Sequence, residues 1–171
     1  TAVLFSDLTG STALYERIGD ARAFSVVEEH FREMSRVVEA HRGTVVKTMG
    51  DAVMATFARL PDAVRAAIEM DRVTARQHGH HGVSLKLGVH AGPCLAVRAN
   101  DRLDFFGTTV NVAARLQARA EGHELVVLEK TLGHPEAAAL VRGFARRNFT
   151  ATLKGIRETQ HLVALAIPAE E

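Results

Sequence analysis

Two aspartates lie where apolar segments, expected to be strands, meet turns. Asp7 follows the apolar run 2–5, and Asp51 precedes a second apolar run, 52–57. In a βαββ arrangement the end of the first strand lies beside the hairpin that joins the next two, so the two carboxylates can converge. Two such oxygen donors suit Mg²⁺, which binds a few carboxylates together with substrate phosphates. The pair predicts a metal site, although an aspartate that caps a helix is the commoner arrangement.

The turn after Asp7 has the composition of an anion-binding loop. Thr9, Gly10, Ser11 and Thr12 lie directly before a helical segment, where hydroxyl groups can cap the helix and glycine permits a tight turn. Backbone N–H groups at the start of a helix can hold a phosphate chain. The acidic residues, the turn and the helix start together predict a site for a metal–nucleotide complex.

A second polar group lies on the helix predicted after Gly107. Asn111 and Arg115 are four residues apart, so their side chains share one face of that helix. Apolar neighbours such as Val110 and Val112 place both near a packed face. A buried arginine needs an anionic partner, and phosphate suits the guanidinium because it accepts two parallel hydrogen bonds. The alternative is an ordinary exposed polar stripe.

The elements that must position these residues follow the order β-α-α-β-β-α-β, then a β-ribbon, a helix, a strand and a final β-pair. One amphipathic helix is predicted by apolar residues at helical spacing: Phe24, Val27, Phe31, Met34 and Val38. Alternation over 83–91 predicts a strand, and the glycine in KTMGD predicts a hairpin with Lys47 and Asp51 at its ends. We therefore expect an α+β fold, with a ferredoxin-like βαββαβ core, extra C-terminal strands and helices, and an antiparallel-rich sheet.

Length and composition narrow the class further. The 171 residues fit a single domain, 1–171, and 47% hydrophobic with 24% charged residues is globular. A net charge of +1 without a basic block argues against a nucleic-acid partner. One cysteine, Cys94, favours a reducing, cytoplasmic compartment. Because the chain starts directly on a predicted core strand, we expect a domain excised from a longer protein, whose regulatory segments or membrane attachment lie elsewhere.

A histidine-rich turn, HGHHG, contains His78, His80 and His81 and could bind a transition metal. A surface turn between a helix and a strand is the favoured interpretation, because no cysteine or further ligand lies close in the sequence.

Two helices are expected to be capped by hydroxyl side chains. Thr9, Ser11 or Thr12 would cap the helix that follows the turn after Asp7, and Thr108 or Thr109 would cap the helix predicted over residues 108–120.

Five segments occur in a characteristic order: VLFSDLTGST, GTVVKTMGDAVMATF, LKLGVHAGP, DFFGTTVNVAARL and LKGI. With them, the chain resembles the catalytic domain of class III nucleotidyl cyclases, in the style of bacterial adenylyl cyclases, over residues 3–167. The resemblance implies conversion of ATP to 3′,5′-cyclic AMP and pyrophosphate. It also implies two divalent metal ions, Mg²⁺ or Mn²⁺, and a head-to-tail homodimer with active sites between the subunits.

The resemblance also implies residue roles. Metal binding maps onto Asp7 and Asp51, adenine selection onto Lys47 and Asp104, transition-state stabilisation onto Asn111 and Arg115, and triphosphate contact onto Lys154. Asp51 is then expected to serve the metals of its own half, whereas Lys47 reaches adenine held against the partner's metals.

Other functions stay open. A nucleotide-binding regulatory domain that has lost turnover is a non-enzyme alternative, and a guanylyl cyclase is the alternative enzyme. Guanylyl-type members usually carry Glu and a Cys-like residue where this chain has Lys47 and Asp104. An RNA-binding ferredoxin-like module would need exposed aromatic residues on the sheet, where this chain has acidic residues instead.

Overall fold

A computed structural model of the chain describes residues 1–170. The elements are, in order, β1 (Ala2–Thr9), α1 (Ser11–Ile18), α2 (Asp20–Ala40), β2 (Gly43–Met49), β3 (Ala52–Phe57), α3 (Leu60–His78), η1 (Gly79–His81), β4 (Ser84–Ala91), β5 (Leu95–Ala99), β6 (Arg102–Phe106), α4 (Thr108–Ala118), β7 (Glu124–Leu128), η2 (Glu129–Gly133), α5 (Pro135–Leu140), β8 (Arg146–Thr152) and β9 (Thr159–Ala166).

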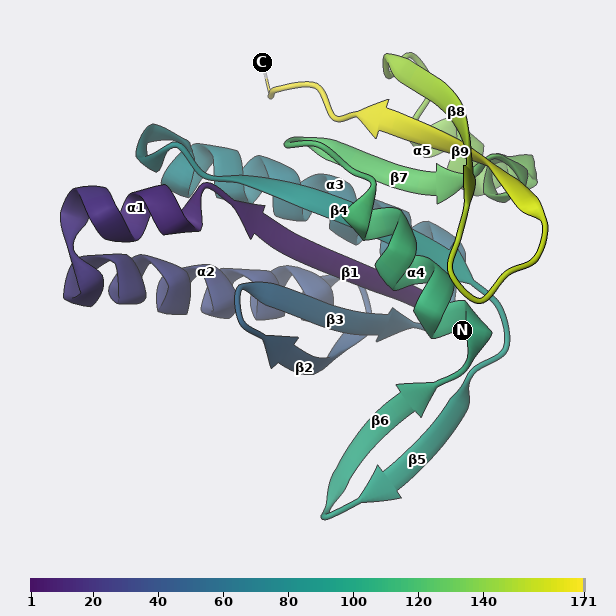
Figure 1. The fold of residues 1–171 in the computed structure, drawn as a ribbon, viewed down its shortest axis with the longest axis horizontal. Coiled ribbons are helices and arrows are strands. Elements are labelled where there is room, and N and C mark those ends of the chain that lie inside the picture. The colour runs from purple at the N-terminus through teal and green to yellow at the C-terminus, as the bar shows by residue number, and fades with distance from the viewer. Residues whose placement is uncertain (171) are drawn as a thin grey trace.

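A seven-stranded sheet, in the order β2-β3-β1-β4-β7-β9-β8, forms the centre of the domain (Figure 1). Strand β1 pairs antiparallel with β3 and β4, and only the β4–β7 pair is parallel among the pairs of this sheet in residues 1–170. The order β2-β3-β1-β4, with helices between the strands, is the expected βαββαβ core. The predicted α+β class and the C-terminal pair β8–β9 are therefore confirmed.

Successive side chains of β1 point to opposite faces of the sheet, and each face is covered by a different layer of helices. Leu4 and Leu8 belong to the larger core beneath α2 and α3, whereas Val3 and Phe5 pack on the other side with Ala113 of α4. Figure 1 shows α2 and α3 behind the sheet and α4 in front of it. Strand β1 thus presents its odd-numbered side chains, which include Asp7, to the face that carries α4.

Close packing of α4 on the sheet depends on a glycine. A Cβ atom at Gly88 of β4 would lie 2.4 Å from the backbone nitrogen of Gln117 in α4. No side chain fits in that space, so the absence of one lets the helix backbone approach the strand directly.

The ribbon formed by β5 and β6 extends away from the main sheet (Figure 1). It carries large apolar side chains that are exposed to solvent: Leu95, Val97, Leu103 and Phe106. A two-stranded ribbon is marginally stable alone in water, and exposed apolar clusters usually mark an interaction surface.

Several predicted details were wrong. Strand β1 continues to Thr9, so Asp7 lies within the strand and not after it. Helices α1 and α4 begin after Gly10 and Gly107, at φ values of 87° and 121°, and no side chain caps either helix. Phe24, expected on the buried face of α2, is 55% exposed. None of the helices in residues 1–170 combines the length and apolar character that a membrane span requires.

Candidate functional site

Asp7 and Asp51 lie close together at one end of the β1–β3 pair. Ser6 of β1 pairs with Val53 of β3, so the next residue, Asp7, lies level with the start of β3 beside Asp51. Burial raises the pKa of Asp7, and the negative charge of Asp51 raises it further. Two carboxylates that repel each other in a half-buried position are a donor set that a divalent cation would stabilise.

The turn after β1 completes this acidic group. Ser11 donates a hydrogen bond from Oγ to Oδ2 of Asp51. The first helical hydrogen bond of α1 runs from Leu14 N to Gly10 O, at 3.0 Å, so the preceding N–H groups open the helix without partners inside it. A Cβ atom at Gly10 would lie 2.6 Å from the carbonyl oxygen of Gly82, which together with its positive φ requires glycine there.

The other residues predicted for this turn have separate positions. Thr9 is half-buried and pairs with Ser84 of β4, whereas Thr12 is exposed on the first turn of α1. The structure therefore brings together Asp7, Asp51 and Ser11, with Thr9 and Thr12 at the edges of the group.

Lys47 and Asp104 form a second group. Lys47 Nζ on β2 donates to Asp104 Oδ2 on β6 at 2.9 Å, and Asp104 Oδ1 accepts from the backbone N–H of Phe105 at 2.8 Å. The hydrogen bond from Lys47 and that from Phe105 hold the pKa of Asp104 below its usual value. A pocket of about 440 Å³ lies beside the pair, lined by residues 44–48 of β2 and by Arg102, Leu103 and Phe105.

A larger pocket, of about 540 Å³, lies between α3 and the C-terminal segment and is lined by residues such as Asp71, Arg76 and His123. It contains none of the predicted site residues. Its volume alone therefore does not make it the functional site, and the chemistry of the side chains takes precedence.

Asn111 and Arg115 share one face of α4, as their spacing predicts, but that face is exposed to solvent. The expectation that they lie near a packed face was wrong. Val112, Ala113 and Leu116 occupy the buried face, against the sheet. Within residues 1–170 no carboxylate forms an ion pair with Arg115, so its guanidinium is available to an anion from outside the chain.

Lys154 is exposed in the loop between β8 and β9, where the backbone turns with a 3.0 Å hydrogen bond from Ile156 N to Leu153 O. The described residues include no hydrogen bond between Lys154 and the other predicted site residues. One chain thus presents two groups of side chains. Asp7, Asp51 and Ser11 are called the acidic group below, and Lys47 and Asp104 are called the recognition group.

Sequence reasoning missed Lys86, which pairs with Asp7 across β1 and β4. Its positive charge lowers the pKa of Asp7 and so opposes the effects of burial and of Asp51. The alternation of β4 could have placed Lys86 on the face opposite to the larger core, because it lies between the core residues Leu85 and Leu87. Only the register of the pair reveals that the lysine faces an aspartate.

Comparisons with known proteins agree with this architecture. A family model described as "Adenylate and Guanylate cyclase catalytic domain" matches residues 1–158. An uncharacterized protein of Mycobacterium tuberculosis is 33% identical over 153 residues, which is 88% of this chain and 37% of that protein. Adenylate cyclase 1 of Rhizobium meliloti is 28% identical over 142 residues, covering 73% of this chain and 21% of the relative. The chain therefore spans little more than a third of the length of the first of these relatives.

Solved structures show the same fold. The adenylyl cyclase CyaB from P. aeruginosa matches with a TM-score of 0.74 at 23% identity, covering 96% of this chain and 92% of that chain. The guanylyl cyclase Cya2 matches equally well, with a TM-score of 0.74 at 22% identity over 99% of this chain and 92% of that chain. Because the family model covers most of the sequence, the chain belongs to the adenylate and guanylate cyclase catalytic domain family.

Proposed function

We propose that this domain is an adenylyl cyclase, which converts ATP to 3′,5′-cyclic AMP and pyrophosphate at sites shared across a head-to-tail homodimer. The observation that carries the choice of adenine is the hydrogen-bonded pair Lys47–Asp104 beside its pocket. The fold alone does not select the base, since an adenylyl and a guanylyl cyclase match it equally well.

The pair suits adenine by its hydrogen-bonding pattern. Adenine has an amino group at C6 that donates and a ring nitrogen N1 that accepts. Asp104, held as a carboxylate by its two donors, accepts from the amino group, and Lys47 donates to N1. Guanine has the reverse pattern, so groups that become covered when the base binds would be left unpaired, and sites of this kind can discriminate by about 10⁴.

The acidic group suits divalent cations. Asp7 and Asp51 would hold two such ions, Mg²⁺ or Mn²⁺, because they supply hard oxygen donors whose mutual repulsion a cation relieves. Bound ions of this kind lower the pKa of the ribose 3′-hydroxyl and neutralise charge on the phosphates. Ser11 fixes the position of Asp51, and the N–H groups after Gly10 can bind the phosphates together with the hydroxyls of Thr9 and Thr12.

The residues of α4 would act on the substrate held by the partner subunit. Arg115 stabilises the charge that develops around the α-phosphate during ring closure, and Asn111 orients the ribose. Lys154 contacts the triphosphate. Their exposure supports this arrangement, because an arginine that pairs with no carboxylate of residues 1–170 can bind an anion across an interface.

The β5–β6 ribbon supports a dimer. Its exposed apolar residues, which include Leu95 and Phe106, would be covered in a head-to-tail pair. A monomer would then contain two half-sites and no complete one. We place the domain in the cytoplasm, with regulatory domains or a membrane attachment supplied by other segments of a longer protein.

The proposal is tested by incubating the purified chain with ATP or GTP and Mn²⁺ at several protein concentrations. We expect cyclic AMP as the main product and an activity per chain that increases with concentration as subunits pair. Predominant cyclic GMP would indicate a guanylyl cyclase. No cyclic product from a folded dimer would indicate the regulatory, non-catalytic alternative.

Shared sites are tested by mixing Asp7→Ala chains with Asn111→Ala chains. With random pairing, half of the dimers are mixed and each has one intact site, so the mixture should recover about a quarter of wild-type turnover. Each variant alone, at the same total concentration, is the control. If both variants dimerise and the mixture stays inactive, the shared-site arrangement is wrong.

A further inference from the structure

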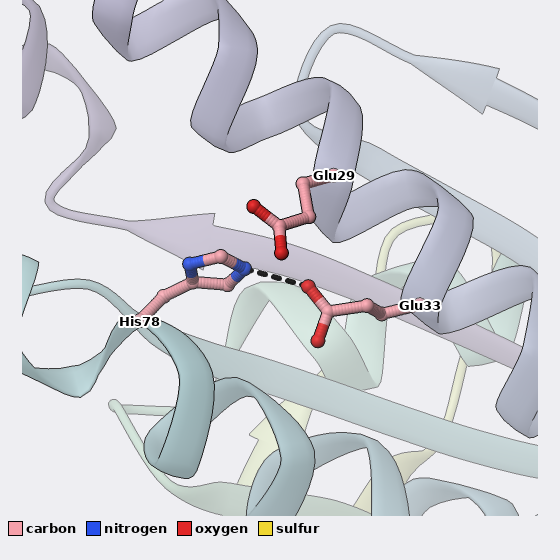
Figure 2. Close-up of side chains that lie close together, drawn as sticks. All are labelled: Glu29, Glu33 and His78. Carbon is pink, nitrogen blue, oxygen red and sulfur yellow. Dashed lines mark hydrogen bonds and ion pairs between the residues drawn. The ribbon is translucent and has the colours of Figure 1, made fainter.

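A cluster of ionisable side chains lies on the α2–α3 side of the sheet, away from the face that carries Asp7 and α4. Glu29 and Glu33 come from α2, and His78 is the last residue of α3. Figure 2 shows both carboxylates directed toward the imidazole, and one ligand atom from each residue lies within 4.8 Å of the other two. These three residues are called the α2–α3 cluster below.

The cluster is partly buried and partly open. His78 Nε2 lies 2.7 Å from Glu33 Oε1, and their side chains are only 4% and 8% exposed. Glu29 is exposed, one helical turn before Glu33, so the two carboxylates share one face of α2. Two ligands four residues apart on a helix, with a third from another element, is a common way to build a metal site.

His78 was expected in a surface turn, and the structure corrects that interpretation. No ligand lies near His78 in the sequence, but α2 brings Glu33 to it from 45 residues away. His80 and His81 do belong to the short turn η1, outside the cluster.

A second feature at the same place is His30, which is completely buried. Neither of its ring nitrogens has a hydrogen-bond partner within residues 1–170, and its ring meets that of His78 edge-on, with centroids 6.4 Å apart. A buried imidazole without partners is costly, and it places further unused nitrogen donors next to the cluster.

We propose that the α2–α3 cluster binds a transition-metal cation, Zn²⁺ in the first instance, at a site separate from the candidate active site. One imidazole nitrogen and two carboxylates match zinc chemistry, with water in the open position. Mg²⁺ fits less well because it prefers oxygen ligands alone. The proton shared between His78 and Glu33 would leave to solvent, and the cation would take its place between the two atoms.

The geometry requires only a small adjustment. Ligand atoms around tetrahedral zinc lie about 3.3 Å apart for bond lengths near 2.0 Å, so His78 and Glu33 would separate by roughly half an ångström. His78 lies at the end of α3, where such a shift does not disturb a helix interior. Glu29 is exposed and can move to complete the site.

The position of the site suggests what the cation would do. It would join α2 to the end of α3, and the loop that follows His78 supports the turn of the candidate active site. Gly82 in that loop lies against Gly10, and Arg17 of α1 donates to the carbonyl of His81. A ligand that binds only the folded chain also raises its stability.

The test uses chains that carry Asp7→Asn and Asp51→Asn, which removes the candidate catalytic metal site. Co²⁺ serves as the spectroscopic probe, and Zn²⁺ affinity is measured by competition with a chromophoric chelator. Glu29→Gln is the decisive variant, because Glu29 is exposed and forms no hydrogen bond among the described residues. Glu28→Gln is its matched control, one residue away and also exposed, and His80→Gln controls for the histidine-rich turn.

We expect one Zn²⁺ per parent chain, visible Co²⁺ bands, and a melting temperature that rises with Zn²⁺. Glu29→Gln should weaken Zn²⁺ binding at least about tenfold and remove most of the rise, whereas the two controls should behave as the parent. If a folded parent binds no Zn²⁺, or if Glu29→Gln binds Zn²⁺ as tightly as the parent does, the proposal is wrong. In that case, Glu33 and His78 form only a buried ion pair.

Discussion

The acidic group and the recognition group differ in how firmly a single chain holds them. Asp7 lies on β1, which is paired on both sides, and Asp51 is fixed by Ser11. Lys47 and Asp104 are instead joined between β2, an edge strand, and the protruding ribbon, with side chains 41% and 30% exposed. The acidic half of the proposed site is thus held by the central strands of the sheet, whereas the recognition half lies at the exposed edge, where a partner subunit would cover it.

The energetics of the two groups differ in the same way. The acidic group carries an unfavourable interaction, because burial and Asp51 both disfavour the ionised form of Asp7. The Lys47–Asp104 pair is favourable, but an exposed ion pair contributes at most about 1 kcal/mol to stability. In the proposed function the value of the pair would therefore lie in recognition, and a bound cation would offset the cost of the acidic group.

The largest expected effect comes from the acidic group. Asp51→Asn should lower turnover by roughly 10³-fold or more, since the loss of a metal ligand removes several kcal/mol of transition-state stabilisation. The same change should raise the stability of the metal-free chain, because it removes a charge that repels Asp7. Turnover and thermal melting in the presence of a chelator measure the two effects. A loss of activity below tenfold would contradict the assignment.

Arg115→Ala should have the next largest effect. We expect kcat to fall by about 10²–10³ with little change in KM, because the guanidinium acts on charge that develops in the transition state. Stability should not change, since Arg115 is exposed and forms no ion pair with the carboxylates of residues 1–170. Arg119→Ala, exposed directly after the same helix, is the matched control. Equal losses in the two variants would indicate a general electrostatic effect.

The sequence was sufficient for the fold because the fold depends on periodicity and on turns. Alternation predicted β4, helical spacing predicted α2, and Gly50 predicted the β2–β3 hairpin that separates Lys47 from Asp51. The approach of Asp7 to Asp51 also followed, since it depends only on the order of neighbouring strands.

Details that depend on distant parts of the chain could not be predicted. Helix α4 has apolar residues on both sides of Asn111, so the sequence does not show which face the sheet covers. Gly10, which precedes α1, lies against the carbonyl of Gly82, and His78 is buried beside Glu33 of another helix. Each of these features arises from contacts between residues far apart in the sequence, for which a single sequence contains no local signal.

Lys47→Met tests the recognition group, and its expected effect is smaller than that of the two preceding variants. Loss of a charged hydrogen bond to the base should lower kcat/KM for ATP by about 10- to 100-fold and reduce the preference for ATP over GTP. Stability should change by less than about 1 kcal/mol, because the pair with Asp104 is exposed. Steady-state kinetics with both nucleotides, together with thermal melting, measure these effects. An unchanged ATP-to-GTP ratio would remove Lys47 from base selection.

The smallest effect is a difference in titration between the two groups. In the metal-free chain the pKa of Asp7 should lie above 3.8, because burial and Asp51 disfavour its charge, and that of Asp104 should lie below 3.8, because Lys47 and Phe105 favour its charge. Carboxyl-carbon NMR across acidic pH measures both midpoints.

The signs of the linked stability changes are opposite. Above pH 3.8 the folded chain holds the Asp7 proton more tightly than the unfolded chain does, so this group makes stability fall as pH rises through its raised pKa. Asp104 stabilises the fold above pH 3.8, and that contribution is lost as pH falls through its lowered pKa. As pH falls, protonation should therefore weaken metal affinity at a higher pH than it weakens base recognition. Asp51→Asn should bring the midpoint of Asp7 down and leave that of Asp104 in place, whereas a common shift of both would show that the two groups are not independent.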